Sequence, residues 1–180
     1  MKRIILFIAA LALVSNLSYA QQKGLTSGKQ YSFTETKVMP KMKKTTERKG
    51  TMVFDAPENL RMDYAQPAGD YTHIAAGKFD VCKAGKVQHL PVKDPKHPMS
   101  VYRATLLYCL GGDVEKAAKL NHAAIDYTTS GKTRVCTLSV AKAAPRDIAK
   151  LQLTYALPSG QLQSMTITEG NGNYTTYTIQ

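Results

Sequence analysis

The chain of 180 residues contains no tryptophan, and only three of its residues are cysteines. Three cysteines are too few for a disulfide scaffold, and no two of them form a Cys-x-x-Cys pair. In an oxidising compartment one pair could form a disulfide and leave one thiol over. However, Cys82, Cys109 and Cys136 all have apolar neighbours in the sequence. We therefore expect them to act as small buried hydrophobic residues.

The sequence also lacks the motifs of common enzymes. The segment GLTSGKQ (24–30) has only three residues between its glycines and a glutamine after its lysine, so it does not fit a phosphate-binding loop. No Gly-x-Ser-x-Gly motif is present. The four histidines show no spacing typical of a zinc site. They are His73, His89, His97 and His122. We therefore expect that the protein is not an enzyme and that it has no cofactor and no metal site. If it were an enzyme, these histidines would have to form a polar cluster inside a cavity.

Long apolar runs are absent after the N-terminus. There, two basic residues precede an apolar run over residues 4–14, and a Ser-Tyr-Ala sequence ends at Ala20. This is the pattern of a cleaved secretory signal peptide, and the apolar run is too short to span a bilayer comfortably. We expect a signal peptide over residues 1–20 and one exported domain over residues 21–180.

Acidic residues are scarce, and the formal net charge of the whole chain is +11. Without Lys2 and Arg3, 22 basic residues remain against 13 acidic ones, which leaves a net charge of +9. Such a charge favours acidic partners or anionic membrane surfaces, although it could also serve solubility alone. Because the chain is expected to be exported, we do not expect a nucleic acid as partner.

Short alternating segments separated by Gly, Asn and Ser make up most of the remaining sequence. This pattern is typical of antiparallel strands joined by tight turns. The expected strands are 30–39, 50–55, 60–64, 71–76, 79–82, 87–90, 123–129, 134–140, 151–157, 162–169 and 174–179. The lysine-rich segment 37–50 is expected to be a solvated loop between the first two strands.

The helical part of the sequence lies in the middle, over residues 99–120. Val101, Leu106, Leu107 and Leu110 fall within helical reach of one apolar face. A helix here should stop at the glycine pair 111–112, and a second one should begin with Asp113 as its N-cap.

The segment that runs from Lys49 to Pro67, KGTMVFDAPENLRMDYAQP, resembles the periplasmic lipoprotein carriers of the LolA type. The matching residues are Gly50, Phe54, Pro57, Leu60, Arg61, Met62, Tyr64, Gln66 and Pro67. The order of the expected elements extends the resemblance over residues 25–180. Three departures mark a divergent member: Met62 stands where many relatives have tryptophan, Ala56 stands where enterobacterial carriers have an arginine linked to onward transfer, and no C-terminal extension follows Gln180.

The resemblance implies a mainly β fold: an unclosed antiparallel β-barrel of about 10–11 strands with one or two helices covering its mouth. It also implies a monomeric periplasmic carrier that shuttles acylated lipoproteins from an inner-membrane exporter complex to an outer-membrane acceptor. The expected lining of the apolar cavity is Tyr31, Phe33, Phe54, Met62, Tyr64, Leu106, Leu107, Leu110, Tyr155 and Met165. The lysines expected to dock on a partner or membrane are Lys41, Lys43, Lys44 and Lys49.

Two other functions fit the same sequence. The fold could instead bind a free lipid or glycolipid of the cell envelope, or serve in envelope-stress sensing. Alternatively, the apolar strand faces could close into a dry core, as in a purely structural protein.

Overall fold

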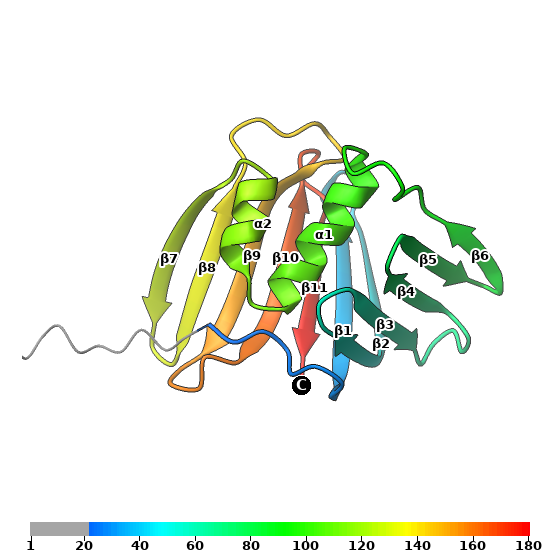
Figure 1. Ribbon diagram of the computed structural model, residues 1–180, viewed down its shortest axis with the longest axis horizontal. Helices are drawn as coiled ribbons and strands as arrows, with labels where there is room; N and C mark the ends of the chain where they lie inside the picture. Colours follow the sequence, from blue (N-terminus) through cyan, green and yellow to red (C-terminus); the bar gives the residue numbers. More distant parts are fainter. Residues whose placement is uncertain (1–21) are drawn as a thin grey trace, which may run out of the picture.

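A single sheet of eleven antiparallel strands forms the body of the protein (Figure 1). The computed structural model describes residues 22–180. The expected signal peptide therefore lies outside the described residues. The order of the strands in the sheet is β6-β5-β4-β3-β2-β1-β11-β10-β9-β8-β7. Because β6 and β7 do not pair with each other, the sheet stays unclosed, as the resemblance implies.

The elements follow one another with short turns between them. The strands before the helices are β1 (Gln30–Met39), β2 (Lys44–Asp55), β3 (Asn59–Tyr64), β4 (Tyr71–Ala75), β5 (Lys78–Lys83) and β6 (Lys86–His89). The helices are α1 (Pro98–Leu110) and α2 (Val114–Leu120), and a short 3-10 turn, η1 (Pro40–Met42), joins β1 to β2. The later strands are β7 (Ala124–Ser130), β8 (Thr133–Ser139), β9 (Ile148–Ala156), β10 (Leu162–Glu169) and β11 (Tyr174–Ile179).

The two runs of strands meet in the middle of the sheet. Strand β1 pairs with the last strand, β11, and each run then continues outward by hairpins to an edge. The helices lie between the two runs in the sequence, and both cover one face of the curved sheet (Figure 1).

Alternation along the strands decides which side chains face the helices. In β3, Leu60, Met62 and Tyr64 are buried, whereas Asp63 is exposed and Arg61 is half-buried. On the outer face Arg61 Nη2 lies 2.6 Å from Asp63 Oδ1. Since successive side chains of a strand point to opposite faces, one face of the sheet and the helices form the core.

Two helix ends agree with the sequence prediction: α1 stops at Leu110, directly before the glycine pair, and α2 begins after Asp113. Helix α1 begins at Pro98 after His97, whose Nδ1 accepts a hydrogen bond from Met99 N at 3.1 Å. Helix α2 begins after Asp113, whose Oδ1 accepts from Lys116 N at 3.2 Å. Such N-cap bonds satisfy backbone N–H groups that have no partner inside the helix.

The prediction of a solvated, lysine-rich loop over residues 37–50 is wrong. Strand β1 continues to Met39 and β2 starts at Lys44, so only residues 40–43 form the turn of a long hairpin. Lys43 has a φ of 50°, which lets the chain reverse after η1. Backbone pairing between β1 and β2 holds this polar sequence in strand form although its side chains lack the apolar alternation that signals a strand.

The three cysteines are buried and form no disulfide. Burial raises the pKa of the Cys109 thiol to about 12 and that of Cys136 to about 11. The two thiols therefore stay protonated at neutral pH, and their role as small buried residues is confirmed.

Across residues 22–180, neither helix has the length and apolar character needed to cross a membrane.

Candidate ligand pocket

A pocket of about 590 Å³ lies between the concave face of the sheet and helix α1. Its walls come from β1 to β5 on one side and from β10 and β11 on the other, and α1 closes it like a lid. The volume falls within the range of pockets that bind small ligands. The apolar residues in its wall include Met52, Leu60, Met62, Leu106, Leu110 and Met165. Three of these six are methionines, whose flexible side chains adapt to ligands of irregular shape.

Helix α1 is attached to the β4–β5 side of this pocket by two contacts. Arg103 Nη2 donates a hydrogen bond to the backbone oxygen of Ala75 at 2.7 Å. The rings of Tyr102 and Phe79, which both line the pocket, stack with their centres 6.4 Å apart. One hydrogen bond and one aromatic contact therefore attach α1 to strands β4 and β5.

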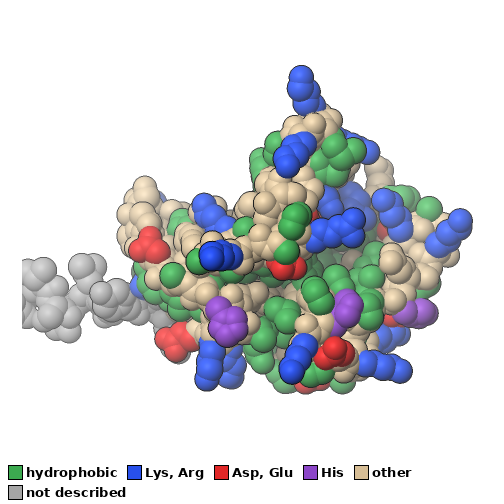
Figure 2. Space-filling view, turned by 90° about the horizontal axis from the view of Figure 1, so that it is seen from above, with side chains coloured by type: hydrophobic (Ala, Val, Ile, Leu, Met, Phe, Trp, Pro, Cys, Tyr) green, Lys and Arg blue, Asp and Glu red, His purple; other side chains and the backbone are tan. Residues whose placement is uncertain are grey.

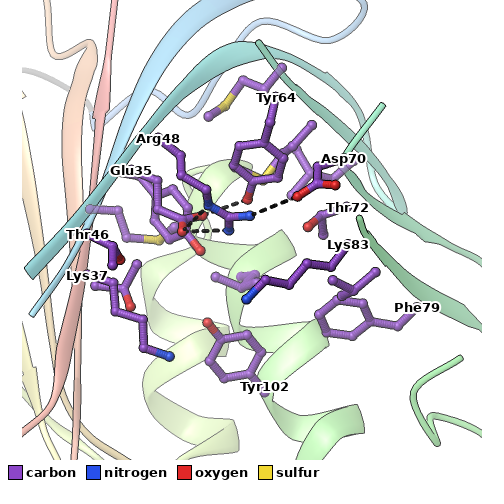
Figure 3. Close-up of a pocket in the computed structure, with 18 of the residues that line it drawn as sticks. Glu35, Lys37, Thr46, Arg48, Tyr64, Asp70, Thr72, Phe79, Lys83 and Tyr102 are labelled. Atoms are coloured by element: carbon purple, nitrogen blue, oxygen red, sulfur yellow. Dashed lines mark hydrogen bonds and ion pairs between the residues drawn. The ribbon is translucent and has the colours of Figure 1, made fainter. Parts of the chain in front are cut away.

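One wall of the pocket is polar, which the sequence analysis missed (Figure 3). Arg48 Nη2 and Nε donate to Glu35 Oε1 at 2.7 and 3.2 Å. Tyr64 Oη donates to Glu35 Oε2 at 2.6 Å, so both oxygens of this carboxylate are engaged. The Arg48 guanidinium also lies 3.8 Å from the centre of the Tyr64 ring.

The protonation of this cluster follows from burial and charge. Burial, and next the negative charge of Glu35, raise the pKa of the Tyr64 hydroxyl well above its ordinary value. Partial burial acts to lower the pKa of Arg48, but the hydrogen bond with Glu35 and the nearby charges outweigh it and raise that pKa. Arg48 therefore stays charged, and Tyr64 stays a hydrogen-bond donor.

Asp70 lies at the edge of the same cluster. Its Oδ1 accepts a hydrogen bond from Ala84 N at 2.7 Å. Its Oδ2 has no hydrogen-bond partner among residues 22–180, and Arg48 Nη1 is 4.0 Å away. With a side chain that is only 2% exposed, Asp70 is the most deeply buried carboxylate of the pocket wall. The arginine thus lies between two carboxylates and is hydrogen-bonded to Glu35 alone.

The ten residues expected to line the cavity are all buried, but they divide into two sets. Those in the pocket wall are Met62, Tyr64, Leu106, Leu110 and Met165. Those buried elsewhere in the core are Tyr31, Phe33, Phe54, Leu107 and Tyr155. Phe33 nevertheless supports the wall, because its ring contacts Tyr64 edge-on with the centres 5.4 Å apart.

The four expected docking lysines are exposed and lie at two places on one hairpin. Lys41 and Lys43 lie in its turn, beside Met42 with 68% of its surface exposed, and Lys44 directly follows the turn. Lys49 lies farther along β2, with its Nζ 3.6 Å from Glu47 Oε1.

The histidines do not form the polar cluster that an enzyme would need. None of the four is in the pocket wall, where the cluster consists of Glu35, Arg48, Tyr64 and Asp70 instead. His73, His89, His97 and His122 lie on strands, turns or helix ends outside it. Within the described part of the chain, no group of three or more His, Cys, Asp or Glu residues is placed to hold a metal ion.

A signal for the polar wall was present in the sequence. In β1, Glu35 and Lys37 continue the alternation of the buried residues Tyr31 and Phe33. A charge on the inward face of a strand indicates a buried pair or a site, because a buried charge needs a partner. The partner, Arg48, comes from β2 directly opposite Glu35.

Comparisons with known proteins give likeness in structure only. No protein-family model matches the sequence, and no curated protein matches it. A LolA superfamily protein from Nitrosomonas europaea is 8% identical with a TM-score of 0.42, over 89% of this chain and 87% of that one. A chain in the complex of the CwlD amidase with the GerS lipoprotein from Clostridioides difficile is 15% identical with a TM-score of 0.41, over 79% and 78%.

A third similar structure is the lipoprotein LppX from Mycobacterium tuberculosis. It is 10% identical with a TM-score of 0.37, over 84% of each chain. At these low identities and TM-scores, the three likenesses carry no information on the function.

Proposed function

We propose that this protein is a periplasmic carrier that binds the acyl chains of lipoproteins in the pocket under α1 and shuttles them from the inner to the outer membrane. The observation that carries the proposal is the pocket of about 590 Å³ with methionine and leucine side chains in its wall. An inner-membrane exporter would load the carrier, and an outer-membrane acceptor would unload it.

The physical need for such a carrier comes from the cost of exposing acyl chains to water. Each CH₂ group that is buried contributes roughly 0.8 kcal/mol, so a multiply acylated protein cannot cross an aqueous space unshielded. A sheet that is not closed on itself can widen to admit chains, whereas a small closed barrel is filled by its own side chains. Flexible Met52, Met62 and Met165 favour loose binding, which a carrier needs in order to release its cargo.

The test is to recover the protein from the periplasm of cells that express the full chain, and to identify bound acylated peptides by mass spectrometry. Leu106→Trp should reduce the recovered lipoprotein, because a larger side chain at this pocket position fills the space for the acyl chains. Thr128→Trp, on the exposed edge strand β7, is the matched control and should recover as much as the unchanged protein. Equal recovery with both variants would contradict a role of the pocket.

A second candidate function is the binding of a free envelope lipid. The polar wall of Glu35, Arg48 and Tyr64 favours it, because a pocket for acyl chains alone has no use for a buried ion pair. Phospholipid in place of acylated peptides in the same recovery experiment would establish this second function.

A further inference from the structure

Three cations in the pocket wall have no partner of opposite charge. They are Lys37 of β1, Lys83 of β5 and Arg146 of the segment before β9. None of the three forms an ion pair with any residue from 22 to 180. Lys37 and Lys83 extend from opposite sides of the pocket toward one another, on either side of Tyr102 (Figure 3). Three separate parts of the fold thus supply unneutralised positive charge to one cavity.

The carboxylates of the same pocket compensate this charge only in part. Glu35 is hydrogen-bonded to Arg48 and Tyr64, and Asp70 accepts from Ala84 N. Glu169 accepts hydrogen bonds from the side chains of two asparagines of the β10–β11 turn, Asn171 at 3.0 Å and Asn173 at 3.5 Å. None of these carboxylates forms an ion pair with Lys37, Lys83 or Arg146, and the pocket wall holds four cations, Arg48 included, against three carboxylates, which leaves a net charge of +1.

The pocket combines these charges with its apolar wall. Figure 2 shows lysine and arginine side chains beside a hollow with hydrophobic side chains in it. Met62, Leu106 and Met165 supply apolar surface in the same cavity that Lys37 and Lys83 enter. A cavity with these two kinds of wall matches an amphiphile, whose chain contacts the apolar side while its head contacts the cations.

We propose that the pocket selects amphiphiles whose acyl chain carries an anionic group, a phosphate or a carboxylate, and that Lys37, Lys83 and Arg146 hold this group. The inference rests on the proposed function in one respect, namely that the pocket binds acyl chains. It adds that the charge of the head decides which chain is retained. The three cations are partly or fully exposed, so each contributes modestly and salt weakens the effect.

The experiment compares two probes with the same chain. The affinity of the unchanged protein is measured for hexadecyl phosphate, which is anionic, and for hexadecylphosphocholine, whose head has no net charge. We expect the anionic probe to bind about tenfold more tightly at low salt. Palmitate as a third probe distinguishes a carboxylate from a phosphate, and tighter binding of either anion than of the phosphocholine supports the proposal.

The decisive variant replaces Lys37, Lys83 and Arg146 by glutamine together. It should bind hexadecylphosphocholine as before. Its affinity for hexadecyl phosphate should fall about tenfold, so that both probes bind equally well. The control variant replaces Lys86, Lys119 and Lys132, three exposed lysines outside the pocket wall, and should keep the preference at the same net charge. Two results would overturn the anion site alone. In the first, the variant at Lys37, Lys83 and Arg146 still prefers hexadecyl phosphate. In the second, the unchanged protein binds both probes with equal affinity. If neither probe binds, the acyl-binding function fails as well.

Discussion

Two arginine–carboxylate pairs of the sheet differ mainly in burial. The Arg48–Glu35 pair faces the pocket at 2.7 Å, and its side chains are 29% and 8% exposed. The Arg61–Asp63 pair lies on the outer face at 2.6 Å, and its side chains are 42% and 51% exposed. Because the two pairs have nearly the same distance, a difference in their contributions to stability would come from burial.

Arg48→Ala should lower the free energy of unfolding by about 2–4 kcal/mol, because it leaves Glu35 charged and poorly solvated in the pocket wall. Arg61→Ala should cost less than about 1 kcal/mol, since an exposed pair competes with water on both sides. Urea unfolding of the two variants measures the difference. Equal losses would show that the pocket pair is as well solvated as the outer one.

Gly50 makes room for the aromatic contact behind the pocket. A Cβ at this position would lie 2.1 Å from the backbone oxygen of Asp63 and 3.0 Å from the Phe33 ring. Gly50→Ala should therefore lower the free energy of unfolding by about 1–3 kcal/mol, the usual cost of overpacking. Thr51→Ala, at the next position of β2, removes atoms instead of adding them and is the control. Thermal unfolding of both variants would contradict the steric argument if Gly50→Ala were the more stable.

At the scale of elements, the edge strand β6 has four exposed residues and depends on its attachment to β5. Besides the backbone pairing of the two strands, Asp80 of β5 contributes to it, because His89 Nδ1 of β6 lies 2.7 Å from Asp80 Oδ1. Lys78 Nζ, on β5 itself, lies 2.9 Å from Asp80 Oδ2. The hydrogen bond from Lys78, and next the one from His89, lower the pKa of the Asp80 carboxyl below its ordinary value. This edge should therefore be sensitive to acid.

The direction of the pH effect follows from the lowered pKa. The folded protein binds the Asp80 proton less tightly than the unfolded chain does, so Asp80 stabilises the fold above the ordinary carboxyl pKa of about 4. This contribution is lost as the pH falls through the lower pKa of the folded state. The difference in unfolding free energy between the unchanged protein and Asp80→Asn should thus be largest near neutral pH and shrink in acid. Asp126→Asn, which removes one carboxylate from the exposed strand β7, is the matched control.

The sequence predicts the bounds of a strand correctly only where apolar and polar residues alternate along most of the strand. Strands such as Leu162–Glu169 are correctly placed because Gly turns bound them and buried side chains such as Met165 and Ile167 alternate with less buried ones, although a register shift after Leu162 interrupts the alternation. The long β1–β2 hairpin was missed between Lys37 and Gly50, since its polar residues carry no alternation and only backbone pairing reveals it. For the same reason the pairing of Glu35 with Arg48 in the polar wall was not predicted. The two residues lie opposite each other only in the register that the turn at residues 40–43 sets.

At the scale of the whole molecule, two groups of cations lie at separate places and have different expected roles. Lys37, Lys83 and Arg146 lie in the pocket, whereas Lys41, Lys43 and Lys44 lie in or directly after the turn of the hairpin. The proposed carrier function requires the protein to approach a membrane or a membrane complex without losing its cargo to water. A charged tip away from the pocket could make that approach while the pocket keeps the chain covered by α1.

We expect the hairpin tip to bind anionic membranes. The exposed Met42 can enter the interface of the bilayer, and each lysine near the surface contributes about 1 kcal/mol through the negative surface potential. Replacing Lys41, Lys43 and Lys44 by glutamine should weaken binding to vesicles that contain phosphatidylglycerol at least about tenfold, as measured by co-sedimentation. The same three changes at Lys86, Lys119 and Lys132 alter the net charge equally and should have a smaller effect. If the two triple variants lose affinity alike, net charge alone attracts the protein to the membrane. A loss confined to the tip variant, with unchanged binding of hexadecyl phosphate, would show that docking and ligand binding use separate sets of cations.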